Sequence, residues 1–275
     1  MKLLRYESNG FAHVGIFRHG KVMSIPTNKS VLEILNLPRK DRDELELQAG
    51  RNHVIDIDKV KLLPPVEPRV LRDFVTFEGH IAGMKKSEPG DGSVPESWYE
   101  TPVSLLINPY TVKASGEPIP VPPLTQAMDY ELEVAVILRK PAVDVTPEEA
   151  KDLIAGYCIL NDWSARDIQA WEYQPLGPLL SKSFASTISP WLVTMEALAP
   201  YRVPFAHPPE DPQPLPYLDS ADNRAAGGID IQLSADLLTT RMRDQGAAAH
   251  RLCLTNYRHA YWTVAQMVAH HTVNG

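Results

Sequence analysis

The chain has 275 residues, 44% of them hydrophobic and 22% charged, with a formal net charge of −7 at pH 7. A chain of this length can bury a substantial core, and its acidic balance argues against nucleic acid and anionic membrane surfaces as partners. Cys158 and Cys253 form no CxxC motif, so neither a disulfide framework nor a zinc cage is indicated, and no apolar run approaches the length of a membrane span. A cytoplasmic globular protein is the expectation.

The first 66 residues are predicted to form a small β-rich domain. Three short strands are expected over residues 2–7, 11–17 and 18–25. The sequence Arg18-His19-Gly20-Lys21 fits a hairpin connection, and a helix over residues 30–37 ends at Pro38. Prolines at positions 64, 65 and 68 mark a linker, because proline removes a backbone donor and restrains the residue before it. The sequence therefore predicts domains at 1–66 and 67–275.

Several elements stand out in the second predicted domain. The run YELEVAVIL, residues 130–138, predicts a strand. Residues 147–157 begin as a helix, with Thr146 as its N-cap and Glu149 three residues later. Residues 256–271 carry apolar side chains at helical spacing and predict an amphipathic helix. Seven prolines within residues 200–216 indicate an extended surface loop.

Two carboxylates project from one side of the predicted strand at 130–138. A strand period of two sends Glu131 and Glu133 to the same face, where their repulsion is costly unless a proton or cation lies between them. A solvated face is the alternative, and the two glutamates alone do not exclude it. Asp162 ends another apolar run, and Asp73 lies inside the apolar segment LRDFVTF. Four such carboxylates favour an oxygen-only site for a hard divalent cation, Mg²⁺ or Ca²⁺.

The stretch NDWSARDIQ, residues 161–169, places further polar groups directly after an apolar run. If Ser164 caps a helix, three polar residues fall at i, i+3 and i+7 on one face, namely Arg166, Gln169 and Tyr173. Asp162 would then lie at the helix N-terminus. An exposed helix face, with Arg166 paired to Glu172 or Asp162, is the alternative.

Two further residues are candidates for reactive groups. His80 follows Asp73 by seven residues in FEGHIAG, a glycine-flanked stretch, and Lys182 lies between serines in LLSKSFASTISP. A lone histidine or lysine in a loop is usually solvated, so neither indicates chemistry by itself. The sequence contains no GxSxG, HExxH or P-loop motif, and no GxGxxG after a strand.

Four stretches of the sequence together indicate a family. They are DFVTFEGH at 73–80, DYELEVAVIL at 129–138, NDWSARDIQAWEYQPLGPLLSKSFASTISPW at 161–191 and YWTVAQMVAHHTVNG at 261–275. They closely resemble bacterial-type members of the fumarylacetoacetate hydrolase (fumarylacetoacetase) family, and the resemblance extends from about Val70 to Gly275. It implies an α+β fold that is mainly β, a mixed β-sandwich roll with a small β-rich N-terminal domain.

The resemblance also implies a set of site residues. The carboxylates that hold the family's divalent metal are matched here by Asp73, Glu131, Glu133 and Asp162. His80 matches the general base, and the substrate-contacting pair is matched by Gln169 and Tyr173. Arg166 and Lys182 match the groups that polarise the substrate. In some members a second metal involves the lysine and a hydroxyl, which are matched by Lys182 and Ser186.

The implied activity is hydrolysis of a carbon–carbon bond in a fumarylacetoacetate-like or acylpyruvate diketo acid, a reaction of aromatic amino acid catabolism. The family's usual form is a homodimer with Mg²⁺ or Ca²⁺, and Mn²⁺ is a further candidate ion. Relatives with the same metal ligands decarboxylate, isomerise or hydrate 2-oxo acids, so these reactions are alternatives. A chain that binds metal without turnover is a third interpretation.

The chain departs from the family pattern at two places. Members usually continue past the position of Gly275, so the resemblance predicts a chain that lacks a C-terminal segment. In the fumarylacetoacetate-cleaving members, that segment supplies a glutamate that orients the catalytic histidine. Glu78, two residues before His80, is the candidate replacement. Val75 stands where the fumarylacetoacetate enzyme has a substrate-contacting tyrosine, which leaves the exact substrate open.

Overall fold

The computed structural model describes residues 1–51, 53–85 and 92–273. They form two compact units, each built from several stretches of the chain. The first unit comprises Met1–Asp73, Leu105–Pro141 and Asp152–Ala197, and the second comprises Phe74–Ser104, Ala142–Lys151 and Leu198–Gly275. The predicted domain boundary between residues 66 and 67 is a different division, and it stays a prediction.

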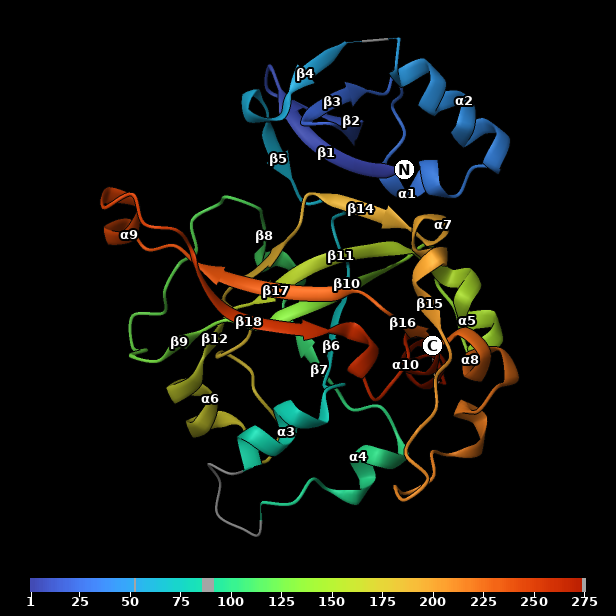
Figure 1. Cartoon of the computed structure of the whole chain (residues 1–275), viewed down its shortest axis with the longest axis vertical. Coiled ribbons are helices and arrows are strands. Elements are labelled where there is room, and N and C mark those ends of the chain that lie inside the picture. Colours follow the sequence, from blue (N-terminus) through green and yellow to red (C-terminus); the bar gives the residue numbers. More distant parts are fainter. Residues whose placement is uncertain (52, 86–91, 274–275) are drawn as a thin grey trace. The chain divides into compact units, whose positions relative to one another are not determined.

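A ten-stranded mixed sheet is the framework of the first unit in the described part of the chain (Figure 1). Eight of its strands follow one another in the order β4 (Val54–Asp56), β3 (Lys21–Ser24), β2 (Phe11–Arg18), β1 (Lys2–Ser8), β14 (Trp191–Thr194), β11 (Ile154–Asp162), β13 (Ser186–Ile188) and β8 (Val112–Ala114). The other two, β5 (Lys61–Leu63) and β10 (Leu132–Leu138), pair with β1 and β11. Only the pairing of β13 with β8 is parallel among those described. The expected mainly β, α+β fold class is confirmed.

The hairpin predicted at Arg18-His19-Gly20-Lys21 is present between β2 and β3. Its two central residues have positive φ angles, 50° at His19 and 74° at Gly20, and Arg18 pairs with Lys21. This combination is typical of a type I′ turn, whose twist matches that of the flanking strands. The connection from β1 to β2 is built in the same way, with Asn9 at 53° and Gly10 at 80°.

Two helices and the sheet enclose the main core of the first unit. Helix α1 (Val31–Leu35) is capped by Ser30, which exchanges hydrogen bonds with Glu33 in a capping box, so the predicted helix at 30–37 is confirmed. Helix α2 (Arg39–Ala49) follows Pro38, where no helix was predicted. Fully buried side chains of α1 and the strands fill the space between them, including Leu3, Ile34 and Leu192.

Strand β11, which ends at Asp162, packs unusually close to β14. A Cβ atom added at Gly156 would lie 2.3 Å from Leu192 Cδ2 and 2.4 Å from the Val193 carbonyl oxygen. Only glycine fits at this contact, because real Cβ atoms do not approach other atoms so closely. The sequence thus places glycine where it allows the strand that carries Asp162 to join the sheet.

Several short elements complete the first unit. Strands β9 (Met128–Asp129) and β12 (Ser164–Ala165) form a two-stranded sheet, and β12 leads directly into helix α6 (Arg166–Glu172). Strand β6 (Leu71–Phe74) pairs with β7 (Ser104–Ile107). Helix α7 (Met195–Leu198) follows β14, and 3₁₀ turns lie at Ile57–Lys59 and Pro109–Thr111.

The second unit consists of short helices and two-stranded ribbons. Its helices are α3 (Glu78–Lys85), α4 (Glu96–Glu100), most of α5 (Pro147–Leu153), α8 (Ala221–Ala226), α9 (Thr240–Asp244) and α10 (Val264–His271). The ribbons pair β15 (Arg202–Val203) with β16 (Gly228–Ile229) and β17 (Gln232–Leu237) with β18 (His250–Asn256). Its 3₁₀ turns lie at Ala199–Tyr201, Pro216–Leu218 and Tyr257–His259. No helix among the described residues of either unit is long and apolar enough to cross a membrane.

Two predicted helices are shorter than expected. Helix α5 (Pro147–Leu153) begins as predicted, because Thr146 and Glu149 exchange backbone and side-chain hydrogen bonds, but residues 154–157 belong to β11. The helix predicted over 256–271 begins only at Val264, where Thr263 and Gln266 form a capping box. Residues 257–259 are a 3₁₀ turn instead, capped by the Asn256 side chain. In both cases apolar residues at helical spacing are also compatible with a neighbouring strand or turn, and the cap residues determine the boundary.

His207 lies among aromatic rings of the second unit. Its ring centroid is 4.4 Å from that of Tyr261 and 5.1 Å from that of Trp262. Its Nδ1 is buried without a hydrogen-bond partner among the described residues. Burial disfavours the charged imidazolium and lowers the pKa of His207 to about 4, although Asp211 and Asp219 act in the opposite direction. The imidazole is therefore neutral in the folded chain at pH 7.

We expect His207 to weaken the fold as the pH falls. The unfolded chain binds a proton near the ordinary pKa of 6.5, whereas the folded chain does so only near 4, so stability is lost across this window. A His207→Phe variant keeps an aromatic ring and should show a smaller drop in Tm on acidification from about pH 7 to about pH 4.5. Circular dichroism measures both curves, with exposed His259→Gln as the control. An equal drop in Tm on acidification for the wild type and His207→Phe would contradict this expectation.

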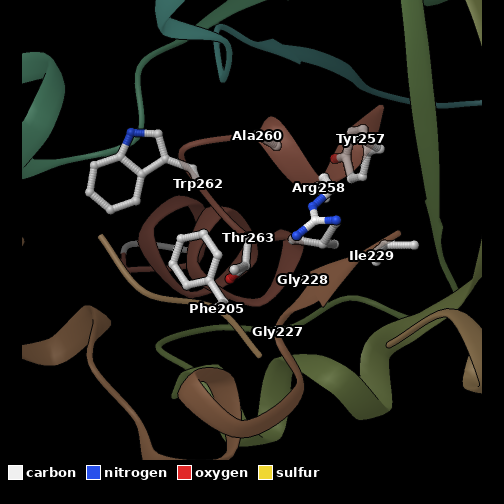
Figure 2. Close-up of a pocket in the computed structure, with 10 residues that line it drawn as sticks. Phe205, Gly227, Gly228, Ile229, Tyr257, Arg258, Ala260, Trp262 and Thr263 are labelled. Carbon is white, nitrogen blue, oxygen red and sulfur yellow. The ribbon is translucent and has the colours of Figure 1, made fainter. Parts of the chain in front are cut away.

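A pocket in the second unit contains none of the predicted site residues (Figure 2). Aromatic and aliphatic side chains line most of it, including Phe205, Ile229, Tyr257 and Trp262. Arg258 contributes the guanidinium group visible in Figure 2. The carboxylates singled out by the sequence lie in the first unit.

Candidate metal centre

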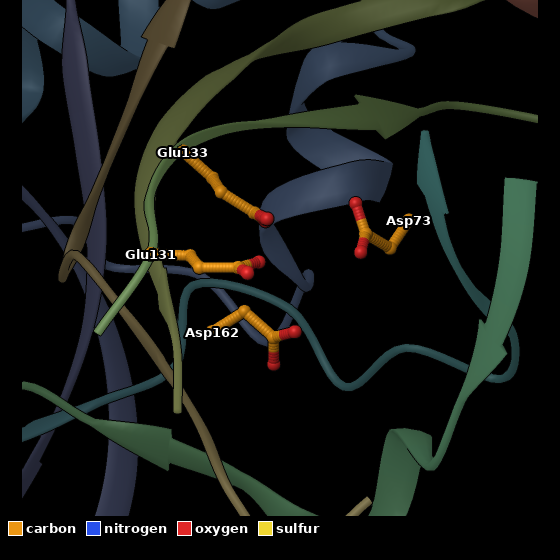
Figure 3. Close-up of side chains that lie close together, drawn as sticks. All are labelled: Asp73, Glu131, Glu133 and Asp162. Carbon is orange, nitrogen blue, oxygen red and sulfur yellow. The ribbon is translucent and has the colours of Figure 1, made fainter. Parts of the chain in front are cut away.

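Four carboxylates from separate parts of the sequence meet in the first unit (Figure 3). They are those of Asp73, Glu131, Glu133 and Asp162. One oxygen from each lies within 4.8 Å of those of the others. We call these four residues the carboxylate cluster. Strand β6 supplies Asp73, strand β10 and the residue before it supply the glutamates, and the end of β11 supplies Asp162.

The pairing of β10 with β11 positions three of these carboxylates. The backbone N–H of Glu131 donates to the carbonyl of Asp162 at 3.1 Å, and the N–H of Asp162 donates back to Glu131 at 3.1 Å. This reciprocal pair places the two side chains opposite each other across the strands. Glu133 lies two residues further on and therefore points to the same side. The predicted common side of Glu131 and Glu133 is confirmed, but their face is not solvated, since the Glu131 side chain is only 12% exposed.

Two cations lie against the carboxylate cluster. Lys182, whose side chain is 3% exposed, forms ion pairs with Glu131 Oε2 and, at 3.0 Å, with Asp162 Oδ2. Arg166 donates from Nη1 to Glu131 Oε1 at 2.7 Å and from Nε to Asp129 Oδ2 at 2.9 Å. The alternative pairing of Arg166 with Glu172 or Asp162 was therefore wrong. Lys182 is in a loop, as the sequence indicated, but its ammonium group is buried among carboxylates.

The cluster carries more negative charge than these cations neutralise. Burial is the largest cause that raises the pKa of Asp73 to about 7, and the Asp162 and Glu131 carboxylates raise it further against the opposing effect of Lys182. Burial also raises the pKa of Asp162 to about 6, although Lys182 opposes it, and it raises that of Glu133 well above the ordinary value. When all four are ionised, Lys182 and Arg166 leave at least two charges uncompensated.

The donor set fits a hard divalent cation. Such ions take carboxylate oxygens as ligands, and a charge of +2 would favour the ionised carboxylates against the burial and the mutual repulsion that raise these pKa values. Asp162 Oδ2 is buried and faces the Lys182 ammonium group at 3.0 Å, and because a carboxylate oxygen has two lone pairs, one stays available for a metal ion. The four residues therefore form a group that could hold a metal ion.

Helix α6 carries polar side chains to the edge of this cluster. Arg166 Nη1 donates to Gln169 Oε1 at 3.0 Å, so these two residues share a face, as predicted. Tyr173 is the C-cap residue of the helix and donates its N–H to the Gln169 carbonyl at 3.0 Å. Ser164 is not the cap: it lies in β12, and its hydroxyl donates to the Asp162 carbonyl at 3.3 Å. The helix begins at Arg166, so its N-cap is Ala165, and Ser164 instead pairs with Asp129 in the β9–β12 sheet.

Ser186 belongs to the immediate surroundings of the carboxylate cluster. It is fully buried in β13, and its Oγ donates to Asp162 Oδ1 at 3.1 Å. The hydroxyl therefore holds the orientation of one candidate metal ligand. The predicted second metal at Lys182 and Ser186 stays a prediction.

His80 and Glu78 lie in the second unit. Both belong to the first turn of α3, so the glycine-flanked stretch is helical. His80 is exposed, and Glu78 Oε1 accepts a hydrogen bond from the Tyr99 hydroxyl at 2.8 Å. Their predicted roles as general base and orienting carboxylate stay predictions.

The sequence interpretation missed Asp129 and the function of Glu172. Asp129 precedes Glu131 by two residues, so the same strand period could have identified a third acidic side chain in line, and this one pairs with Arg166. The sequence indicated Glu172 only as a possible ion-pair partner of Arg166. Its carboxylate instead accepts hydrogen bonds from the loop that leads to Lys182. No local pattern signals such a contact, because it depends on how the loop folds back.

Known proteins share both sequence and fold with this chain. A family model described as Fumarylacetoacetate (FAA) hydrolase C-terminal matches residues 69–274. The fumarylacetoacetase of Dictyostelium discoideum is 34% identical over 277 residues, covering 93% of this chain and 62% of that protein. The fumarylacetoacetase of Caenorhabditis elegans is 46% identical over 168 residues, covering 59% and 38%. The chain thus spans about half the length of the curated relatives that it matches.

Solved structures with lower sequence identity share the fold. Fumarylacetoacetate hydrolase from Exiguobacterium antarcticum has a TM-score of 0.64 and 20% identity, covering 99% of this chain and 81% of that one. Maleylpyruvate hydrolase from Sphingobium sp. SYK-6, in complex with manganese(II) ion and pyruvate, has a TM-score of 0.65 and 17% identity, covering 99% and 83%. Because the family model matches most of the chain and a relative at 34% identity aligns with 93% of it, the chain belongs to the fumarylacetoacetate hydrolase family.

Proposed function

We propose that this protein hydrolyses a carbon–carbon bond in a diketo acid of the fumarylacetoacetate or acylpyruvate class. The observation that carries the proposal is the carboxylate cluster with Lys182 and Arg166 against it. The two carbonyl oxygens of a 1,3-diketo acid can chelate a divalent cation, and the carboxylate cluster offers ligands for such a cation. The relatives named fumarylacetoacetase, and a neighbour of the same fold named maleylpyruvate hydrolase, support this substrate class.

The proposed metal is a divalent cation, Mg²⁺ or Ca²⁺, with Mn²⁺ as a further candidate. The residues that would hold it are Asp73, Glu131, Glu133 and Asp162. A bound cation would act as a Lewis acid that polarises the carbonyl under attack. The manganese and pyruvate in the Sphingobium enzyme support both the class of ion and the class of product.

Each remaining residue has a proposed part in moving protons or charge. His80 would accept a proton from water as the water oxygen adds to the carbonyl carbon, and Glu78 would orient the imidazole. The carbon–carbon bond then breaks, its electron pair leaves as an enolate, and protonation of that enolate gives the second product. Lys182 and Arg166 would offset the negative charge that develops, while Gln169 and Tyr173 would orient the substrate.

The test is an assay of the full chain with fumarylacetoacetate and simple acylpyruvates in the presence of Mg²⁺. We expect loss of diketone absorbance together with two acid products in equal amounts. Release of carbon dioxide without cleavage products would reject the hydrolase in favour of a decarboxylase. Rearranged substrate would indicate an isomerase, and hydrated substrate would indicate a hydratase. Metal binding without any turnover would indicate a chain that binds the ion but is not catalytic.

We also propose a cytoplasmic homodimer. Large apolar side chains in and after α6 face solvent, with Trp171 84%, Leu176 82% and Leu180 70% exposed. Contact with a second copy of the chain would cover this patch. Sedimentation of the wild type should give twice the mass of one chain, and Trp171→Ser should weaken the association. A wild-type mass of one chain would reject the dimer.

A further inference from the structure

The carboxylate of Glu172 is surrounded by hydrogen-bond donors from a single loop. Its Oε1 accepts from the backbone N–H groups of Leu179 at 2.7 Å and Ser181 at 2.8 Å, and from the Ser181 hydroxyl at 2.7 Å. Its Oε2 accepts from the N–H of Leu180 at 3.1 Å. Burial by itself would raise the pKa of Glu172, but the donors outweigh it and lower the pKa. The group is therefore an ionised carboxylate held by charge-assisted hydrogen bonds.

This contact joins the end of α6 to the residues that come directly before Lys182 in the following loop. Glu172 is the last residue of α6, whose first residue is Arg166, and the bonded donors are the three residues before Lys182. Ser181 is also held from its other side, because the N–H of Ala165 donates to its carbonyl at 3.1 Å. The backbone just before Lys182 is thus tied to both ends of the helix that presents Arg166.

Within a single chain, apolar packing does not replace these bonds at the loop's leucines. The side chains of Leu176, Leu179 and Leu180 are 82%, 52% and 70% exposed. Lys182, by contrast, must enter the carboxylate cluster with its side chain 3% exposed. Burying an ammonium group requires a fixed geometry with its partners, since the cost of losing water is offset only by well-placed carboxylates. The loop therefore needs a polar anchor, and Glu172 supplies one.

We propose that Glu172 is a positioning residue that holds the Lys182 ammonium in the carboxylate cluster. Its described hydrogen bonds come from residues 179–181 and not from the carboxylate cluster, so it acts through the backbone of that loop. Its effect on turnover rests on the proposed hydrolase function. Its effect on the location of Lys182 does not, so the two claims can be tested separately.

Chemical labelling of lysines tests the location. The full chain is treated with an amine-acylating reagent and analysed by mass spectrometry, with exposed Lys140 as the internal standard. We expect slow labelling of Lys182 in the wild type and in the control Glu148→Gln, an exposed glutamate in α5. Labelling in Glu172→Ala should approach the rate of Lys140. Glu172→Gln should be intermediate, because its Oε1 still accepts while its amide nitrogen faces the N–H of Leu180.

A double-mutant cycle tests how Glu172 affects turnover. Glu172→Ala should lower kcat about 100-fold by displacing a charged group at the reacting centre, and it should cost nothing further in a Lys182→Met background. Independent losses in the two variants, or a folded Glu172→Ala in which Lys182 stays protected, would overturn the proposal. If the wild type shows no turnover, the proposed function fails and the labelling still decides the positioning claim. Should Glu172→Ala not fold, Ser181→Ala removes a single donor, and protection of Lys182 equal to the wild type would count against the proposal.

Discussion

An Asp162→Asn variant is expected to lose most of its diketo acid hydrolysis, with kcat/KM about 1000-fold below the wild type, or about 4 kcal/mol of transition-state stabilisation. Asp162 is fully buried, lies at the end of β11, and contributes one oxygen to the carboxylate cluster. Asparagine keeps the shape and can still accept from Ser186, so the fold should survive. It removes one negative charge and one anionic ligand, which weakens the hold on a divalent cation. Initial rates at saturating Mg²⁺ measure the loss.

Two observations separate loss of metal from loss of structure in this variant. Addition of Mg²⁺ should raise the Tm of the wild type, because an ion that binds only the folded chain stabilises it, and the rise should be much smaller in Asp162→Asn. Asp152→Asn, an exposed aspartate in α5, is the matched control and should behave as the wild type does. Wild-type rates in Asp162→Asn would show that the cluster is not the reacting centre.

A Lys182→Met variant is expected to keep the metal and lose the reaction. Methionine fills a similar volume without charge, so at least one more negative charge in the cluster is left uncompensated and affinity for Mg²⁺ should hold or increase. Without the ammonium group, the charge that develops on the leaving enolate is no longer offset. Removal of one such stabilising donor lowers kcat by about 100- to 1000-fold in other enzymes.

The measurement for Lys182 is a pair of titrations on the same samples. Calorimetry gives the Mg²⁺ affinity, and steady-state rates at saturating Mg²⁺ give kcat. Lys140→Met, at an exposed position, should change neither quantity. A Lys182→Met protein with normal kcat would assign the lysine a purely structural role as counter-ion to the cluster. Loss of Mg²⁺ binding in this variant would show instead that Lys182 holds the carboxylate ligands in position.

The sequence predicted the parts of the site that depend on local periodicity. The alternation in residues 130–138 placed Glu131 and Glu133 on one side, and the apolar run before Asp162 located that carboxylate at a strand end. The cap at Thr146 fixed the start of α5 because Ser, Thr and Glu at these positions satisfy orphan N–H groups in any context. These features require only neighbours within a few residues.

Other parts depend on pairings between distant segments. Ser164 was predicted as a helix cap, but its neighbours in space are residues of β9, which no local pattern connects to it. Lys182 resembles a solvated loop lysine in sequence, and only the contact of Glu172 with residues 179–181 explains why it is buried. The start of α10 was placed eight residues too early because apolar side chains at helical spacing continue back through the 3₁₀ turn at Tyr257–His259.

Calorimetric titration of Mn²⁺ and Mg²⁺ into the full chain after treatment with EDTA is the most direct test of the carboxylate cluster as a metal centre. The cluster predicts saturable binding of one ion per chain, strongly weakened by Glu133→Gln and abolished when Asp162→Asn is added. Absence of binding in the wild type, or binding that is unchanged by the loss of both carboxylates, would contradict it.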